Sequence, residues 1–147
     1  MKNNLFTLLI ALFICTFAFA QNQQVSWSQL ADVSFDMKFM DEIGDTVLIP
    51  DFGDSVKALE GKRIQIKGYI LDLIGDKEKK KYILSREPFA TCFFCGLAGP
   101  ETIIELHFNR SQNFRTDQVV TVVGTLSLNT NDINHCNYIL RNTEVAR

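Results

Sequence analysis

The second half of this 147-residue chain alternates apolar and polar residues in five successive segments, and this pattern constrains the fold most. An alternation with a period of two residues is typical of β-strands that bury one face. The predicted strands are 62–73, 80–86, 102–108, 118–128 and 137–143. The polar segment between the third and fourth strands is too short for more than a turn of helix. The sequence therefore predicts an all-β domain.

The first predicted strand is the longest, and Gly68 lies at its middle. A glycine inside a strand pattern predicts a sharp bend or a bulge, which a tightly coiled barrel strand requires. Five strands, with a long bent first strand and a gap between the third and fourth, match the OB-fold, a small Greek-key barrel. We therefore expect a five-stranded OB-like Greek-key barrel.

A short extension of strand and helix is expected to precede the barrel. Residues 33–39 alternate and predict a half-buried strand. Residues 46–49 predict a second extended segment, which Pro50 is expected to end. Residues 51–60 predict a short helix that Gly61 terminates.

Residues 1–20 predict a secretory signal peptide, not a part of the fold. Lys2 supplies a positive charge, and a mostly apolar run leads to a small-x-small cleavage pattern at residues 18–20. The apolar run is shorter than the ~20 residues that span a bilayer, so we expect no stable membrane insertion after cleavage. Cys15 is expected to leave with the signal, because Ile14 is too bulky for the position before a lipoprotein cysteine.

Residues 21–147 are then expected to form a single OB-like β-barrel domain that is exported, to the periplasm or beyond the cell. The whole chain carries 15 Lys and Arg residues against 17 Asp and Glu residues. A weakly acidic exported protein is a poor candidate for binding nucleic acid or an anionic membrane. We therefore expect no nucleic-acid partner, and instead a small ligand or a protein partner.

The loop between the second and third predicted strands contains the sharpest functional signal. Cys92 and Cys95 lie two residues apart there, in a segment that Gly96, Gly99 and Pro100 close. Two thiols at this spacing either bind a soft metal ion or cycle between dithiol and disulfide.

Several features together resemble a bacterial family of small exported proteins that is classed as a domain of unknown function. These features are Trp27, Leu59-Glu60-Gly61-Lys62, Gly68-Tyr69, the Cys-Phe-Phe-Cys-Gly loop from Cys92, Gly99-Pro100-Glu101 and Tyr138-x-Leu140. The resemblance covers most of the chain after the signal, and the cysteine loop is its most specific part. Some relatives are associated with gene clusters for metal uptake, zinc in particular. The resemblance thus implies a metal-handling role, with a transporter component or another exported protein as partner.

A zinc site with thiolate and imidazole ligands needs four donors in a tetrahedron. Cys92 and Cys95 supply two of them. His135 and Cys136 precede the fifth strand, and the parallel third and fifth strands of an OB barrel begin at the same pole. Adjacent residues of an extended chain point in opposite directions, so only one of His135 and Cys136 is expected to bind the ion. His135 is favoured, because Cys136 can be a small buried hydrophobe. Glu101 or a water is expected to complete the site, although Cys136 is also a candidate ligand.

The competing interpretation is a disulfide. Cys92 and Cys95 would form a structural or redox-active pair, or one of them would pair with Cys136. Strands flank the loop, so activation of Cys92 by a helix dipole is not expected. In this alternative the protein is a non-enzymatic binding or assembly module.

An enzyme is not expected. Only Glu101 and Glu105 lie close enough to the cysteine loop to act as a base for a zinc hydrolase. Glu105 shares the outward face of the third strand with Ile103 and His107, and His107 is expected to be a surface residue. The sequence therefore predicts an exported metal-binding accessory protein with zinc as its cofactor.

Overall fold

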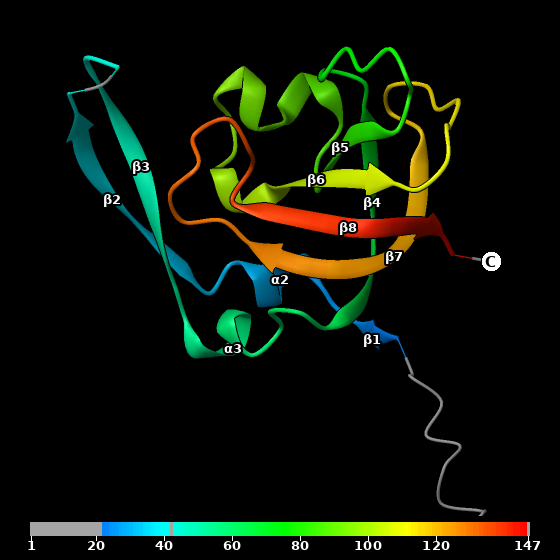
Figure 1. The fold of residues 1–147 in the computed structure, drawn as a ribbon, viewed down its shortest axis with the longest axis horizontal. Helices are drawn as coiled ribbons and strands as arrows, with labels where there is room; N and C mark the ends of the chain where they lie inside the picture. Colours follow the sequence, from blue (N-terminus) through cyan, green and yellow to red (C-terminus); the bar gives the residue numbers. More distant parts are fainter. Residues whose placement is uncertain (1–21, 42, 147) are drawn as a thin grey trace, which may run out of the picture.

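The structure, a computed structural model, describes residues 22–41 and 43–146, and the predicted signal peptide lies outside the described residues. Five strands form a closed barrel, in the order β4-β5-β6-β8-β7 with β7 pairing back onto β4 (Figure 1). The strands are β4 (Arg63–Leu71), β5 (Lys81–Ser85), β6 (Ile103–Phe108), β7 (Val119–Leu128) and β8 (Tyr138–Val145). All neighbours are antiparallel except β6 and β8, which are parallel. The predicted OB-like barrel is confirmed.

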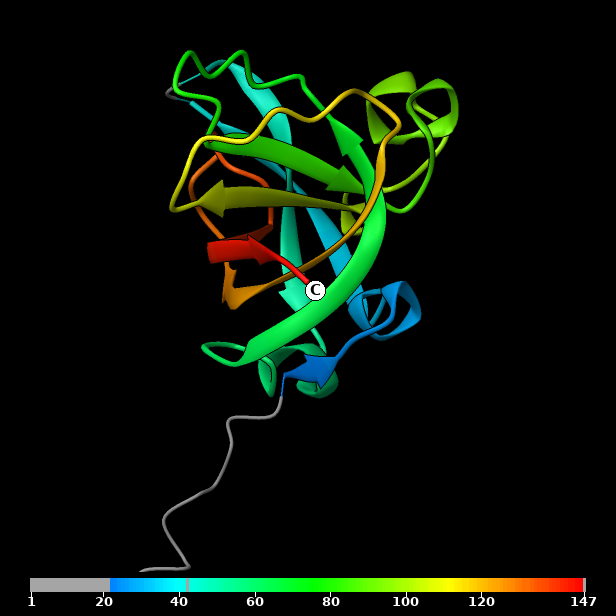
Figure 2. The same cartoon turned by 90° about the vertical axis from the view of Figure 1, so that its right-hand side faces the viewer.

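Strand β4 is bent, as Gly68 predicts, and it curves along the side of the barrel (Figure 2). It pairs with β7 through residues 63–69 and with β5 through residues 69–71. A Cβ at Gly68 would lie 2.6 Å from the Ser85 carbonyl oxygen. Because glycine has no side chain, β4 passes close enough to β5 to close the barrel.

The barrel interior is filled by one side chain in two from each strand, which is the alternation that the sequence shows. The buried residues include Ile64, Ile66, Ile70, Tyr82, Leu84, Ile104, Leu106, Val122, Leu126, Tyr138 and Leu140. The two tyrosines satisfy their hydroxyl groups from within the core: Tyr82 donates to the Gln112 carbonyl at 3.0 Å and Tyr138 to the Leu30 carbonyl at 2.6 Å. The second bond ties the N-terminal segment to the last barrel strand.

The N-terminal segment packs on the barrel and is more ordered than its polar sequence suggests. Strand β1 (Gln23–Gln24) pairs in parallel with β4, and helix α2 (Trp27–Leu30) begins at a capping box formed by Ser26. Leu30 is fully buried, and the Trp27 indole N–H donates to the Lys67 carbonyl at 2.8 Å. Within the described part of the chain, no helix is long and apolar enough to cross a membrane.

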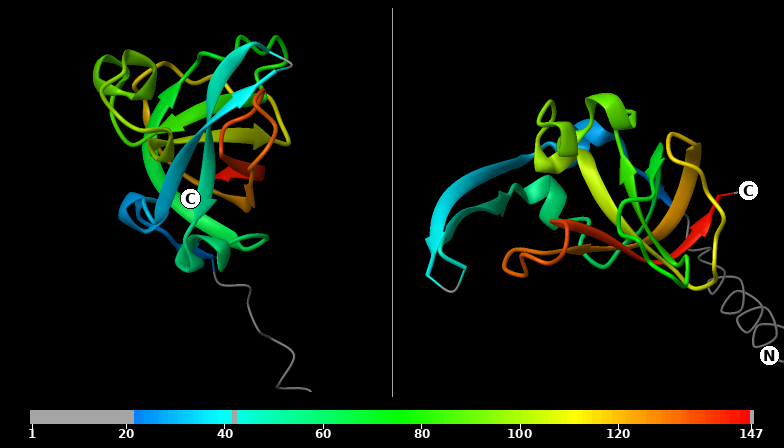
Figure 3. Two further views of the ribbon diagram at one scale, coloured as in Figure 1. Left: turned by 90° about the vertical axis from the view of Figure 1, so that its left-hand side faces the viewer. Right: turned by 90° about the horizontal axis from the view of Figure 1, so that it is seen from above.

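A hairpin of β2 (Val33–Met40) and β3 (Asp45–Phe52) projects from the barrel (Figures 1 and 3). Two expectations are corrected here. Strand β3 continues through Pro50 to Phe52, because the pairing with β2 does not require an N–H at Pro50. The helix expected over 51–60 is the single turn α3 (Asp54–Lys57), followed by turns.

The cysteine loop folds into three short 3₁₀ turns between β5 and β6. They are η1 (Phe89–Thr91), η2 (Phe93–Cys95) and η3 (Pro100–Thr102). Gly96 ends η2 with a φ of 74°, a left-handed conformation that glycine adopts without strain. The loop covers the outer side of the barrel, where Cys92 packs with Leu71, Ile83 and Ile103.

Candidate metal centre

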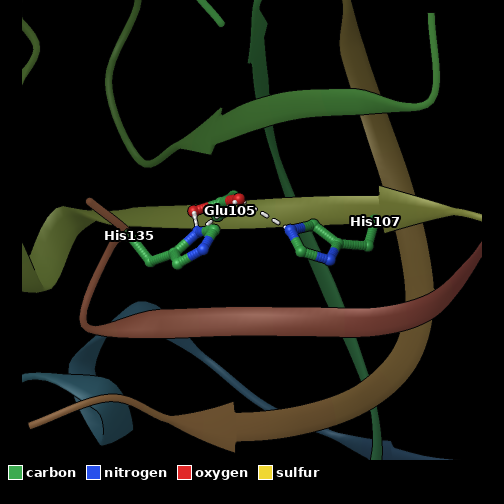
Figure 4. Close-up of side chains that lie close together, drawn as sticks. All are labelled: Glu105, His107 and His135. Carbon is green, nitrogen blue, oxygen red and sulfur yellow. Dashed lines mark hydrogen bonds and ion pairs between the residues drawn. The ribbon is translucent and has the colours of Figure 1, made fainter. Parts of the chain in front are cut away.

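Glu105 is a charged residue buried on the outer side of the barrel, with only 5% of its surface exposed. It lies near the middle of β6, and its carboxylate is the centre of a hydrogen-bonded group (Figure 4). His107 Nε2 lies 2.6 Å from Oε1, and His135 Nδ1 lies 2.9 Å from Oε2. The Cys136 backbone N–H donates to Oε2 at 3.3 Å. We call Glu105, His107 and His135 the Glu–His–His group.

The barrel topology brings this group together. Glu105 and His107 are two residues apart on one strand and therefore point to the same side of the sheet. His135 lies in the loop 129–137, directly before β8. Because β8 runs parallel to β6 and pairs Ile139 with Glu105, this loop ends beside Glu105.

The loop 129–137 is held in shape by its own polar side chains. The Asn129 amide donates to the Asp132 carbonyl at 2.7 Å, and the same nitrogen lies 3.3 Å from the His135 and Cys136 carbonyls. Asp132 accepts from the backbone and the side chain of Asn134, both at 3.0 Å. These bonds fix the position of the His135 imidazole in the absence of a bound ligand.

Electrostatics keep Glu105 ionised. Burial of the carboxyl raises its pKa, but hydrogen bonds from His107, His135 and the Cys136 backbone outweigh burial and lower the pKa to about 2. A second carboxylate lies nearby, since Asp132 Oδ2 is 4.0 Å from His135 Nε2. The bonds from Asn134 lower the pKa of Asp132 as well.

The Glu–His–His group can hold a metal ion. One donor atom from each residue lies within 4.8 Å of the other two, and no other group of three such side chains does so in residues 22–41 and 43–146. Two imidazoles and a carboxylate are the ligands of one type of zinc site that keeps a fourth position open. Zinc bonds of ~2.0–2.1 Å in a tetrahedron place donors roughly 3.3 Å apart, so binding requires donor atoms that lie within 4.8 Å to move closer together by up to about 1.5 Å.

The cysteine loop provides a different environment. The thiols of Cys92 and Cys95 both donate to the Phe89 carbonyl at 3.0 Å, so the two sulfurs lie close together. Cys92 is fully buried and Cys95 is exposed. Desolvation by nearby protein atoms and the neighbouring Cys92 raise the pKa of Cys95, and burial together with the Glu105 charge raises the pKa of Cys136 to about 12. At neutral pH, Cys95 and Cys136 are therefore protonated.

The structure thus brings some of the predicted ligands together and separates others. The cysteine loop and the loop 129–137 meet, because Cys136 packs against the apolar cluster that contains Cys92. His135, however, contacts Glu105 and His107. Cys92, Cys95 and the partly buried Glu101 lie outside the Glu–His–His group.

The sequence did not single out Glu105 and His107 as candidate ligands. The expectation that His107 is a surface residue is wrong, since its side chain is 20% exposed and is hydrogen-bonded to Glu105. The available signal was the Glu-x-His pattern on one strand face. A further signal is that the whole chain contains only two histidines, and both lie in this group.

Two members of the Glu–His–His group, Glu105 and His135, line a groove of about 590 Å³. Its lining residues come mainly from β3, the cysteine loop and the loop 129–137. Glu105, His135 and Cys136 are among its lining residues. This volume lies within the range of about 300 to 1,000 Å³ that is typical of small-ligand pockets.

The fold and the group define a class: an OB-like β-barrel protein with a candidate metal centre outside its third and fifth barrel strands. No protein-family model matches the chain, and no curated protein matches it. Among solved structures, a DUF3299 family protein from Pseudomonas aeruginosa PAO1 is similar, with a TM-score of 0.52 and 14% sequence identity. The match covers 86% of this chain and 97% of that protein. At this identity the likeness shows a shared fold.

The similarity is in line with the resemblance seen in the sequence, because that neighbour also belongs to a bacterial family named as a domain of unknown function. The link between such relatives and metal uptake stays a prediction.

Proposed function

We propose that this protein is an exported metal-binding accessory protein that holds a divalent ion, zinc, through Glu105, His107 and His135. One observation carries the proposal: both histidines of the chain converge on one buried, ionised carboxylate, with their donor atoms within 4.8 Å. Its partner would be a transporter component or another exported protein. These roles follow the resemblance and the signal-like N-terminus.

The chemistry of the group supports zinc over a purely structural hydrogen-bond network. Zinc is borderline in softness and accepts imidazole and carboxylate together. A structural network would satisfy Glu105 equally well, but it would not require the third donor to come from a pre-shaped loop that borders a groove. An ion held by three protein ligands keeps one position for an exchangeable ligand, which suits metal transfer.

The cysteine pair supports a second candidate function. The convergence of the Cys92 and Cys95 thiols on one carbonyl places them well for a disulfide, structural or redox-active. The predicted zinc site of Cys92, Cys95 and His135, completed by Cys136 or Glu101, needs thiolates. In the metal-free chain, Cys92 and Cys95 instead donate to the Phe89 carbonyl, and His135 contacts Glu105. Mass spectrometry of unreduced, alkylated protein distinguishes a Cys92–Cys95 link from two free thiols.

The zinc proposal is tested by titrating metal-free protein with zinc chloride in a calorimeter and by elemental analysis of protein purified without chelator. We expect one equivalent of zinc, and more than about tenfold weaker binding in His107→Gln and in His135→Gln. Cys95→Ser is the matched control and should bind zinc as the wild type does. Unchanged affinity in both histidine variants would overturn the Glu–His–His assignment, and lost binding in Cys95→Ser would restore the cysteine site.

A further inference from the structure

The edge of β3 faces the groove. Four consecutive β3 residues, 47–50, line it. Successive side chains of a strand point to opposite faces, so a run of adjacent lining residues means that the strand presents its edge. Within the described chain, β3 pairs with β2 alone, and its other edge is open. An open strand edge is a template for the addition of another strand.

The pairing pattern shows which backbone groups are available. The Gly53 N–H donates to the Asp32 carbonyl across the hairpin, and antiparallel bonds alternate along a strand. Residues 47, 49 and 51 therefore bond to β2, whereas Thr46, Leu48 and Pro50 point their backbone outward. Pro50 has no N–H, and the Thr46 N–H donates to its neighbour Asp45 at 2.7 Å. The N–H and carbonyl of Leu48 are the pair left for an incoming strand.

The remaining surface of the groove suits an extended peptide. Exposed apolar side chains gather around it: Leu48, Leu73, Ile74, Phe94 and Ile133 are each 38–49% exposed. Such a gathering marks an interaction site. The loop 129–137 lines the groove as well, and the side-chain amides of Asn131 and Asn137 can pair with a peptide backbone, whereas those of Asn129 and Asn134 are bonded within the loop.

Charge then selects one end of the peptide. With a divalent ion bound, Glu105 and Asp132, which lies 4.0 Å from His135, together offset the charge of the ion. Lys81 on the same groove then leaves one net positive charge, and the ion keeps one coordination position. Glu105 and His135 line the groove, so an anionic donor lying in the groove can reach that position. Lys81 is the single cationic side chain among the lining residues that the structure describes, which disfavours a polyanion such as nucleic acid.

We propose that the groove receives the carboxyl-terminal segment of a partner polypeptide, which adds as a strand to β3 at Leu48 and places its terminal carboxylate on the metal of the Glu–His–His group. The carboxylate end of this inference rests on the proposed zinc function. Strand addition provides main-chain hydrogen bonds, and apolar pockets accept alternate side chains.

The experiment uses random decapeptides displayed with free carboxyl termini and selected on the zinc-loaded protein. Enriched sequences are synthesised with a fluorophore and measured by anisotropy. We expect alternating apolar positions, and about tenfold weaker binding when the terminus is amidated or zinc is removed.

Two tests isolate the backbone contact. Leu48→Pro removes the free N–H at a position that points outward like Pro50, and it should weaken the peptide about tenfold; Leu48→Thr keeps the N–H and should lose less. N-methylation of the peptide at each residue in turn should reduce binding at alternate residues only. This second readout does not depend on the folding of any variant.

The outcomes separate the two proposals. Stoichiometric zinc binding without peptide enrichment, or with peptides insensitive to both Leu48→Pro and N-methylation, overturns the strand addition and leaves the zinc function. Equal binding of free and amidated termini overturns the carboxylate contact. A protein that binds no zinc overturns the proposed function and the carboxylate contact with it.

Discussion

The Glu–His–His group and the cysteine loop touch through Cys136, yet burial affects them in opposite ways. Glu105 is buried among three donors, and its pKa falls to about 2. The Cys136 thiol is buried beside that same carboxylate without a cation, and its pKa rises to about 12. Desolvation raises the pKa of both acidic groups, and the hydrogen bonds that Glu105 accepts lower its pKa enough to keep it ionised. The donors that surround each side chain therefore decide whether its charged form is favoured.

The largest effect is expected from Glu105→Ala. The substitution leaves two imidazoles and a backbone N–H without their acceptor in a buried place, which should lower the free energy of unfolding by about 4 kcal/mol. Urea denaturation of metal-free protein measures it. Glu144→Ala, which removes an exposed carboxylate paired with Arg63 at 3.1 Å, is the control and should cost less than about 1 kcal/mol. Equal losses of unfolding free energy in Glu105→Ala and Glu144→Ala would show that the buried, hydrogen-bonded carboxylate contributes no more than the exposed one.

The next effect appears in acid. The pKa of Glu105 falls from an ordinary 4.5 to about 2 on folding, so its contribution to stability is present above pH 4.5 and is lost as the pH falls toward 2. The size is about 3 kcal/mol. Denaturation series at several pH values should show a steeper acid decline in the wild type than in Glu105→Gln. Parallel declines would mean that Glu105 is not ionised preferentially by the fold.

A smaller effect is expected from Cys92→Ser. Cys92 is fully buried in an apolar cluster, and a hydroxyl there keeps the bond to the Phe89 carbonyl but replaces a sulfur that packs well. The loss of stability should be about 1–2 kcal/mol in reduced protein. A loss of zinc from this variant while it remains folded would move the metal site back to the cysteine loop.

The smallest effect is expected from Cys95→Ser. Cys95 is exposed, so the same substitution should change the free energy of unfolding by less than about 0.5 kcal/mol in reduced protein. A larger loss of unfolding free energy in protein without reductant would reveal a stabilising disulfide, because an exposed thiol contributes to stability only when it is part of a disulfide.

The barrel was predictable because its interior face alternates along every strand and Gly68 marks the bend. The parallel third and fifth strands followed from that topology, and so did the meeting of the cysteine loop with the segment before the last strand. The pairing of β2 with β3 was not predicted, because each segment was recognised as extended without a signal for its partner. Strand β1 and helix α2 were missed because they are short.

The candidate site was only half predictable. His135 was singled out, but Glu105 and His107 were placed on an outward strand face, and alternation does not reveal whether another segment covers that face. Here the cysteine loop and the loop 129–137 cover it, so Ile83, Ile103 and Glu105 are buried outside the barrel. The alternating pattern of the strand predicts a solvent-exposed face, and it gives no sign of the two loops that cover that face.

Trp27 is the one tryptophan of the chain, and its place on the barrel gives the protein a built-in spectroscopic reporter. Its indole is bonded to the Lys67 carbonyl, next to Gly68, where a Cβ would lie 3.1 Å from the ring. Its emission therefore reports whether the N-terminal segment is docked at the bend of β4. A red shift that precedes the loss of circular-dichroism signal during denaturation would show that this segment detaches while the barrel is still closed.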